Sequence, residues 1–491
     1  MTKKAKLNRK VKLPKREPLN YKWDLIIIAA ICLAGYILIK YFYPYPITLS
    51  DSGGYVVCAM KNSFSFYRPF GYSQFLRIVH AISPTVSFLT FAQLLLYFIS
   101  TSVFAFTIKY FFPPCKQWIW RSLLVFLTFS PLAFYLINSI MSDLLFSTMI
   151  YFMLSGLVFV IMKGGKGSWF FLLILFLSLF FSLHIRYSAM IFPFIIIPFF
   201  CFLKGHIRWI SILCSLGTFF IFHNQIKSDM RETTGYNQFS TGFDGWQYAN
   251  NAIHITPYAD KELKNQELNS LHKFLLLYND SIKAYTNNGN KVTERFIWNN
   301  NLPLKQYLFK TMKEEYRSYP DAWVYLGSGL YRNYGRYLML HNPSAFMRYY
   351  YLPNSLNIIY PTFNDLPYVT IDTKEIKEYY NIDESKDLSC RYDIYGYFMN
   401  KTISISHIFI WTGIVIIAVF ALVKRKKLKF NKSEKLVFWS LFSFGAIYYA
   451  STVFASPVAM RYWLPMASIQ FACCYIILNK LNKLNKKENN T

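Results

Sequence analysis

The stretch LIIIAAICLAGYILI at residues 25–39 contains fifteen uncharged and almost entirely apolar residues in a row, and similar runs recur along the chain. With its flanks it forms an apolar segment of about 24–43, which as a helix is long enough to cross the roughly 30 Å hydrocarbon core of a bilayer. No small-residue cleavage signature follows it, so we interpret it as an uncleaved first membrane span and not as a signal peptide.

Nine further apolar runs predict an all-α polytopic membrane protein with about ten transmembrane helices. The composition agrees, because 54% of the 491 residues are hydrophobic and only 16% are charged, too few to cover a soluble protein of this size. The predicted spans are about 24–43, 85–108, 118–138, 143–162, 168–184, 187–203, 207–223, 403–423, 435–455 and 459–479.

The net charge of +28 is concentrated in segments that alternate crossings place on one side of the membrane. Six short segments contain 27 of the 53 Lys and Arg residues against four acidic residues, and therefore supply +23 of the total. They are 1–24, 109–121, 163–167, 204–208, 424–435 and 480–491. Because Lys and Arg accumulate in short cytoplasmic loops, this pattern predicts that both termini are cytoplasmic. It also accounts for the basicity without a nucleic-acid partner.

The spans divide the chain into five predicted parts. Two of the segments expected on the outer side are long. An outer segment at 224–402 is too long for a loop without structure of its own, and we expect a mainly helical extracytoplasmic domain there. The first outer loop, 44–84, is the other long outer segment. The predicted parts are a basic cytoplasmic tail (1–23), an N-terminal transmembrane module containing that loop (24–223), the extracytoplasmic domain (224–402), the C-terminal transmembrane helices (403–479) and a second basic tail (480–491).

Two acidic residues are expected at the outer ends of helices. Asp51 follows the first span in a Gly-containing turn, and Asp143 precedes the fourth span in a short outer turn. A carboxylate at either position could accept a proton from an incoming hydroxyl, as a general base does. The alternative, which position alone favours for each residue, is that it caps a helix N-terminus. Two acids at the same outer depth favour a functional role more than either does alone.

Three arginines are also expected on the outer side, against the positive-inside trend. Arg186 and Arg461 stand in very short turns before the sixth and tenth spans, and Arg68 lies beside Pro69 in the first outer loop. A guanidinium group at this depth can form a bidentate pair with phosphate. The alternative is that the side chains reach up to lipid headgroups.

The outer segment also contains a stretch at 242–252, GFDGWQYANNA, that mixes aromatic and amide side chains. Sugar-binding surfaces combine these residue types, because rings cover apolar sugar faces while amides bond to hydroxyls. Packing of an aromatic-rich helix on its neighbours is the alternative, and the pattern alone favours it. We find no phosphate-binding Gly-rich loop with a Lys, no Gly-x-Ser-x-Gly elbow and no HExxH helix.

Taken together, these features resemble the GT-C superfamily of membrane glycosyltransferases, especially its protein-mannosyltransferase-like branch, whose members use polyprenyl-phosphate sugars. The resemblance covers about 45–200 and, more weakly, the last 35 residues. It implies that Asp51 and Asp143 are catalytic. It also implies substrate contacts by Tyr55, Arg68, Tyr72, Arg186, Tyr187, Arg461 and Tyr462.

The resulting hypothesis is an inverting glycosyltransferase at the outer face of a bacterial cytoplasmic membrane. Its expected partners are a polyprenyl-phosphate sugar donor, membrane lipid and a hydroxyl acceptor on a lipid, glycan or protein. No cofactor is expected, although two carboxylates could hold a divalent metal with water and phosphate. The alternatives are a lipid-linked glycan polymerase or ligase, a non-enzymatic lipid or glycan transporter, and a structural membrane subunit. The near absence of ionisable residues inside the spans argues against an ion-coupled transporter.

Overall fold

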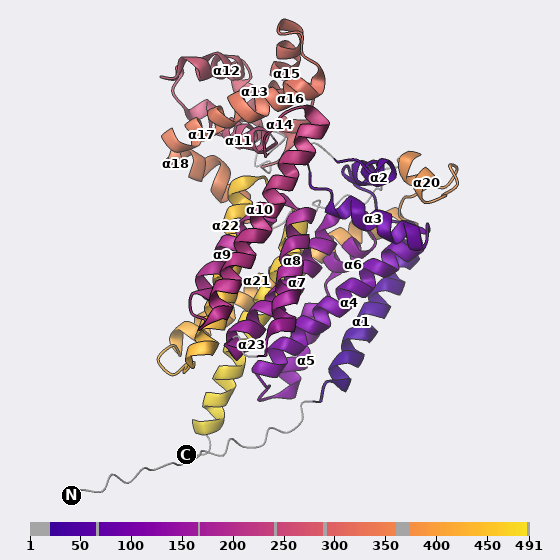
Figure 1. Cartoon of the computed structure of the whole chain (residues 1–491), viewed down its shortest axis with the longest axis vertical. Helices are drawn as coiled ribbons and strands as arrows, with labels where there is room; N and C mark the ends of the chain where they lie inside the picture. The colour runs from indigo at the N-terminus through magenta and orange to yellow at the C-terminus, as the bar shows by residue number, and fades with distance from the viewer. Residues whose placement is uncertain are drawn as a thin grey trace, which may run out of the picture.

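The computed structural model of the chain describes residues 20–64, 68–164, 167–239, 243–287, 292–359 and 374–488. The regular secondary structure in these ranges is helical, and an isolated parallel bridge joins Ile47 to Ser139. Figure 1 shows a bundle of long helices beneath a group of shorter ones, and the first helix begins and the last helix ends at the lower side of the bundle. The prediction of an all-α polytopic fold is confirmed.

Seven helices in the described ranges are long and apolar enough to cross a membrane. They are α1 (Lys22–Phe42), α4 (Val86–Phe111), α7 (Ser142–Lys163), α10 (His206–Thr234), α21 (Asp393–Val423), α22 (Lys432–Ala455) and α23 (Leu464–Glu488). A bent pair, α5 (Gln117–Thr128) and α6 (Pro131–Ile137), makes an eighth span if it is counted as one.

Two shorter apolar helical segments lie where the fifth and sixth spans are predicted. They are α8 (Trp169–Ile185) and the pair η1 (Tyr187–Ile191) and α9 (Phe192–Phe200). The helices therefore coincide with all ten predicted positions. By length and composition, however, only seven or eight qualify as spans, so the count of ten stays a prediction.

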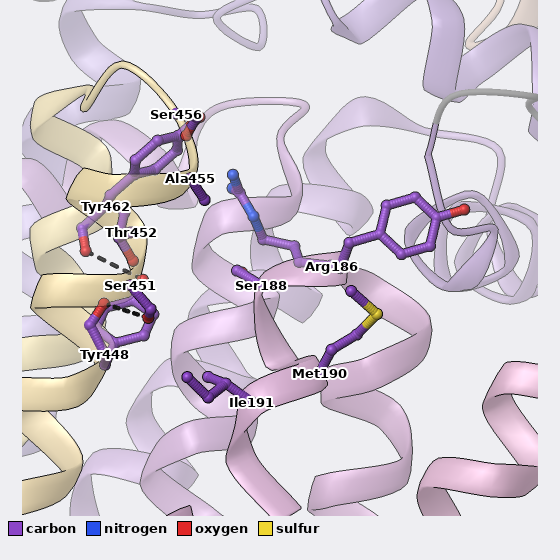
Figure 2. A pocket seen from close by; sticks show the side chains of 11 residues that line it. Arg186, Ser188, Met190, Ile191, Tyr448, Ser451, Thr452, Ala455, Ser456 and Tyr462 are labelled. Carbon is purple, nitrogen blue, oxygen red and sulfur yellow. Dashed lines mark hydrogen bonds between the residues drawn. The ribbon is translucent and has the colours of Figure 1, made fainter. Parts of the chain in front are cut away.

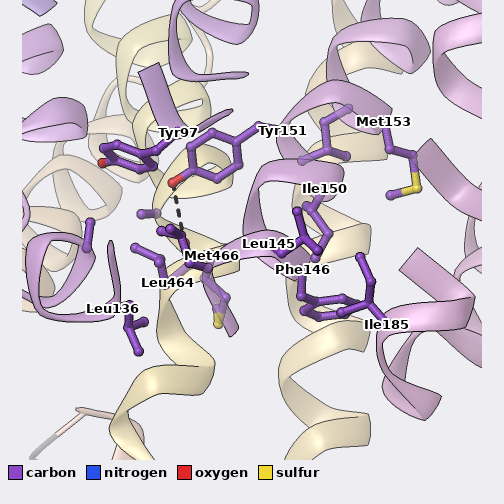
Figure 3. Close-up of a cluster of buried hydrophobic side chains, with 14 of the residues drawn as sticks. Tyr97, Leu136, Leu145, Phe146, Ile150, Tyr151, Met153, Ile185, Leu464 and Met466 are labelled. Carbon is purple, nitrogen blue, oxygen red and sulfur yellow. Dashed lines mark hydrogen bonds between the residues drawn. The ribbon is translucent and has the colours of Figure 1, made fainter. Parts of the chain in front are cut away.

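Helix α7 lies at the centre of the bundle and packs against α4, α8, α22 and α23. Gly156 allows α8 to come close, since a Cβ atom there would lie 2.7 Å from the carbonyl oxygen of Phe171. On another side of α7, the Tyr151 hydroxyl donates to the carbonyl of Leu464 at 3.4 Å, within the buried cluster of Figure 3. This packing ties the middle of α7 to the first residue of α23.

A buried ion pair joins the first turn of α1 to the last turn of α4. Asp24, at the start of α1, contacts the ammonium group of Lys109, and the two side chains are 2% and 1% exposed. The indole N–H of Trp120 donates to the same carboxylate at 3.0 Å. A carboxylate so deeply buried needs such partners, because water cannot solvate it.

The outer segments form the short helices in the upper part of Figure 1. The first outer loop contains α2 (Ser52–Lys61) and α3 (Gly71–Ile82). The second has a buried core of its own around Trp246 and Trp323. Its elements are α11 (Phe243–Ile253), η2 (Thr256–Tyr258), α12 (Gln266–Leu276), α13 (Asn279–Asn287), α14 (Arg295–Trp298), α15 (Pro303–Glu314), α16 (Tyr319–Leu326), η3 (Gly327–Tyr331), α17 (Arg332–His341), α18 (Pro343–Phe346), η4 (Met347–Tyr351), α19 (Leu352–Ile359) and α20 (Lys374–Tyr379).

Candidate active site

Asp51 stands at the N-terminal cap position of α2, but its side chain makes no capping hydrogen bond. The Arg68 Nη2 atom instead donates to Asp51 Oδ1 at 2.9 Å, and Arg68 Nη1 donates to the Asp51 backbone carbonyl at 3.1 Å. The carboxylate remains 32% exposed. Asp51 therefore occupies the cap position that the alternative interpretation predicts, but its carboxylate pairs with the guanidinium of Arg68 instead of capping the helix.

The charges around Asp51 decide its protonation. Burial raises the pKa of the Asp51 carboxyl, but the positive charges of Arg68, Arg461 and Arg186 and the hydrogen bond from Arg68 outweigh it. The pKa of Asp51 therefore lies below its ordinary value, and the group is ionised at neutral pH.

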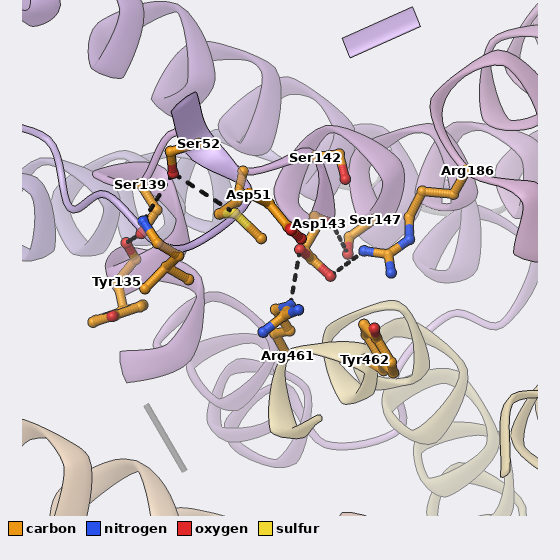
Figure 4. A network of polar contacts seen from close by, with 12 residues as sticks. Asp51, Ser52, Tyr135, Ser139, Ser142, Asp143, Ser147, Arg186, Arg461 and Tyr462 are labelled. Carbon is orange, nitrogen blue, oxygen red and sulfur yellow. Dashed lines mark hydrogen bonds and ion pairs between the residues drawn. The ribbon is translucent and has the colours of Figure 1, made fainter. Parts of the chain in front are cut away.

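Asp143 lies in the first turn of α7, and its side chain is 2% exposed. Its Oδ1 atom pairs with Arg186 Nη1, and its Oδ2 atom lies 3.3 Å from Arg461 Nε, as Figure 4 shows. Arg186 directly follows α8, whereas Arg461 belongs to η5 (Met460–Trp463), which continues directly into α23. One carboxylate therefore holds together two arginines from opposite halves of the chain.

Three tyrosines surround these charges. The Tyr462 ring centroid lies 4.7 Å from the guanidinium carbon of Arg186 and 5.3 Å from that of Arg461. The Tyr55 ring lies 4.5 Å from Arg68, and its hydroxyl is 2.9 Å from the hydroxyl of Ser142. Such stacking attracts a guanidinium and fixes its plane. The Tyr135 side chain is buried and lies within electrostatic reach of Arg461.

Two of the predicted substrate-binding residues lie outside this cluster. Tyr72 is fully buried, donates its hydroxyl to Gln93 at 3.1 Å and packs edge-on against Tyr55. Tyr187 packs its ring against Phe222 and Phe239, with centroids 6.2 and 6.1 Å away. These contacts favour a supporting role for both side chains.

A pocket of about 210 Å³ adjoins Arg186 between the η1–α9 segment and the outer end of α22 (Figure 2). Its apolar walls include Met190, Ile191 and Ala455. Its polar lining includes Arg186, Tyr187, Ser188, Tyr448, Ser451, Thr452, Ser456 and Tyr462. The pocket can thus take an anionic group beside Arg186 and an apolar chain along the helices.

Sequence reasoning missed the contribution of α22 to this pocket. Tyr448, Thr452 and Ala455 recur at helical spacing and so share one face of α22. The available signal was a row of small polar residues inside an apolar span. That signal is weak, because Ser and Thr also pack between membrane helices.

The described residues contain no group of three or more His, Cys, Asp or Glu side chains that could hold a metal ion. The carboxylates of Asp51 and Asp143 each face a guanidinium. The three arginines and two aspartates together carry a net charge of +1. A site with a net positive charge favours the binding of an anion over the binding of a metal cation.

The aromatic and amide stretch at 242–252 forms most of α11, apart from Gly242, which lies outside the described residues. Trp246 is fully buried and stacks on Trp323, with ring centroids 4.0 Å apart. Gln247 and Asn250 are buried as well. These side chains thus form part of the core of the outer domain, as the packing alternative predicts.

No protein-family model matches the sequence, and no curated protein matches it. Among solved structures, the chain is similar to ArnT from Cupriavidus metallidurans bound to undecaprenyl phosphate, with 9% sequence identity and a TM-score of 0.32. The similarity covers 95% of this chain and 79% of that one. A likeness at this level carries no conclusion about activity, so the function has to rest on the site.

Proposed function

We propose that the chain is an inverting glycosyltransferase that moves a sugar from a polyprenyl-phosphate donor to a hydroxyl acceptor at the outer face of a bacterial cytoplasmic membrane. The observation that carries this proposal is the placement of Asp143. It holds Arg186 and Arg461 together beside a pocket between apolar helices, with the ionised carboxylate of Asp51 within electrostatic reach of both arginines.

The pocket suits the lipid end of such a donor. The phosphate would lie near Arg186 and Arg461, and the polyprenyl chain would follow the apolar wall of Met190 and Ile191. As the bond between the sugar and the phosphate breaks, negative charge grows on the phosphate. Preplaced guanidinium groups stabilise that charge more in the transition state than in the ground state.

Asp51 would act as the general base of the transfer. The acceptor oxygen attacks the anomeric carbon from the face opposite the phosphate and gives its proton to the Asp51 carboxylate. The bond between that carbon and the phosphate oxygen breaks, and polyprenyl phosphate leaves. The lowered pKa of Asp51 makes it a weak base, so proton transfer should come late, once the attacking oxygen has become acidic.

Asp143 would hold the two arginines in place. The sequence predicts that it orients the acceptor or shares the role of base. Both of its carboxylate oxygens, however, face guanidinium groups. A carboxylate engaged on both oxygens in this way is placed to position the two arginines.

Replacing the base tests the proposal. Purified wild type and Asp51→Asn, in lipid nanodiscs with a mixture of polyprenyl-phosphate sugars and acceptor glycans, are compared by the release of free lipid phosphate. Asn keeps the shape of Asp but cannot accept the proton, so release should fall by about 10²-fold or more. Asp383→Asn is the matched control, because Asp383 is an exposed outer acid that bonds only locally, to Ser385.

Equal release by Asp51→Asn and wild type would exclude Asp51 as the base and favour a lipid-linked glycan polymerase or ligase, which should depend less on it. If no variant releases lipid phosphate from any donor, the transporter and the structural subunit become the better interpretations.

A further inference from the structure

The outer end of α22 is held by side chains of the outer domain. Helix α22 ends at Ala455, and the last four carbonyl groups of a helix have no partner within it. The chain then turns through residues 456–459, here called the α22–η5 turn, and reaches Arg461 in η5. The N–H of Ser456 donates to the Thr452 carbonyl at 3.2 Å and satisfies the first of the four.

Asn354 of α19 bonds to both sides of this turn and is fully buried. Its Nδ2 atom donates to the carbonyls of Val453 and Ser456 at 2.8 and 2.9 Å. Its Oδ1 atom accepts from the N–H of Val458 at 2.8 Å. The orientation of the amide is fixed, because a flip would set its oxygen against two carbonyl oxygens, which cannot donate.

Asn251 of α11 satisfies the two carbonyls that remain. Its Nδ2 atom donates to Phe454 and Ala455, at 3.1 Å each. The hydroxyl of Tyr449 on α22 also donates to the carbonyl of Ser355 at 2.8 Å, next to Asn354. Two asparagines of the outer domain thus take the place that a capping sequence would normally fill.

We propose that Asn354 and Asn251 are positioning residues that set Arg461 and the α22 wall of the pocket. The outer domain would then be required to hold the residues of the transfer site in place, and would not only cover that site. This inference rests on the proposed function, because Arg461 is one of the two arginines assigned to the donor phosphate.

The short path from Asn354 to Arg461 supports the inference. Val458, which donates to Asn354, lies three positions before Arg461, and the ring of Pro457 fixes the backbone between Ser456 and Val458. Helix α19 also packs directly against η5. Because this turn is stiff, a displacement of Val458 should also displace Arg461.

The pocket depends on the same contacts. Thr452, Ala455 and Ser456 line it, and the carbonyls of Ala455 and Ser456 are bonded to the two asparagines. Loosening either asparagine should therefore move the pocket wall together with Arg461.

A double-mutant cycle tests whether Asn354 acts through Arg461. Asn354→Leu keeps the approximate size but removes the bonds to Val453, Ser456 and Val458, together with one to the Tyr350 hydroxyl. The kcat for lipid-phosphate release should then fall about tenfold or more. In an Arg461→Lys background the same change should lower kcat less than twofold, because the group that it positions is already compromised. Asn342→Leu is the matched control, since the Asn342 amide bonds only to Leu338 in its own segment and should leave kcat unchanged.

Hydrogen–deuterium exchange provides a readout that needs no activity. Deuterium uptake at 456–461 should rise in Asn354→Leu and in Asn251→Leu, while uptake in α15 of the same domain stays at the wild-type level. Asn251→Leu removes only two bonds and serves if Asn354→Leu does not fold.

An additive cycle, in which Asn354→Leu costs the same in both backgrounds, would overturn the inference, as would unchanged uptake at 456–461. If the proposed function is wrong, no variant releases lipid phosphate, and the exchange measurement still decides whether the asparagines hold the turn.

Discussion

Asp143→Asn removes the charge that joins the two halves of the candidate site. The Asp143 carboxylate is 2% exposed and contacts Arg186 and Arg461. Asn preserves the size of the side chain and one oxygen but cannot balance either guanidinium. The substitution therefore leaves two positive groups close together without the negative charge between them.

The expected cost follows from the burial of the partners. Removing one member of a buried ion pair costs about 3–5 kcal/mol, because the remaining charge loses its compensation. The side chains of Arg186 and Arg461 are 21% and 22% exposed, so water can screen them in part. We therefore expect a loss near the lower end of that range, about 3 kcal/mol.

The loss can be measured by equilibrium unfolding in mixed micelles with increasing SDS, followed by tryptophan fluorescence. Asp24→Asn is a matched control away from the candidate site, since Asp24 is also 2% exposed and contacts Lys109. It should destabilise the protein by about 3–5 kcal/mol and leave the activity of the folded fraction intact.

Combining Asp143→Asn with Arg461→Gln separates charge from packing. The double variant removes one of the uncompensated charges and should regain part of the stability, but none of the activity. Wild-type stability of Asp143→Asn, or full transferase activity of that variant, would refute the role assigned to Asp143.

Two further predictions concern the first outer loop. Burial raises the pKa of Asp51, but Arg68 lowers it further, so that the pKa lies below its ordinary value. The rate of lipid-phosphate release should therefore stay constant as the pH falls towards about 4. The ion pair between Asp51 and Arg68 stabilises the fold at pH values above the ordinary pKa of Asp. This stabilisation is lost as the pH falls through the lowered pKa of Asp51. Arg68→Gln should shift the acidic limb of the pH–rate profile to higher pH, and an unmoved limb would contradict this. At Gly71, a Cβ atom would lie 2.5 Å from the carbonyl oxygen of His184, a backbone atom that cannot rotate away. Gly71→Ala should therefore push α3 from the end of α8, cost about 1–3 kcal/mol and lower the melting temperature, whereas Gly217→Ala, with open space around its Cβ, should not.

Sequence alone located the helices well, because length and hydrophobicity are local properties. The predicted spans at 24–43, 143–162 and 435–455 correspond to α1, α7 and α22 within a few residues. It did not show where helices break. The pair α5 and α6 bends by 40° where Ser130 caps a new helix that begins at Pro131, a local event inside a continuous apolar run.

Sequence also predicted that the charged residues lie at the outer ends of helices, because alternate crossings assign a side of the membrane to each turn. It could not assign their partners. Arg186 and Arg461 were both expected near phosphate, but the sequence did not indicate that both also contact Asp143. Nor could it decide that Tyr187 faces α10, since the direction of a side chain depends on the helices packed around it.

The sequence by itself therefore determined a membrane bundle with a set of acids and arginines at one surface. The tertiary structure decided which carboxylate holds which guanidinium, and that α11 and α19 of the outer domain complete the end of α22. The physical reason is that hydrophobic runs act over a few turns of one helix. An ion pair or a capping amide, by contrast, requires atoms from distant segments to meet within about 3 Å, and packing of the whole chain sets that distance.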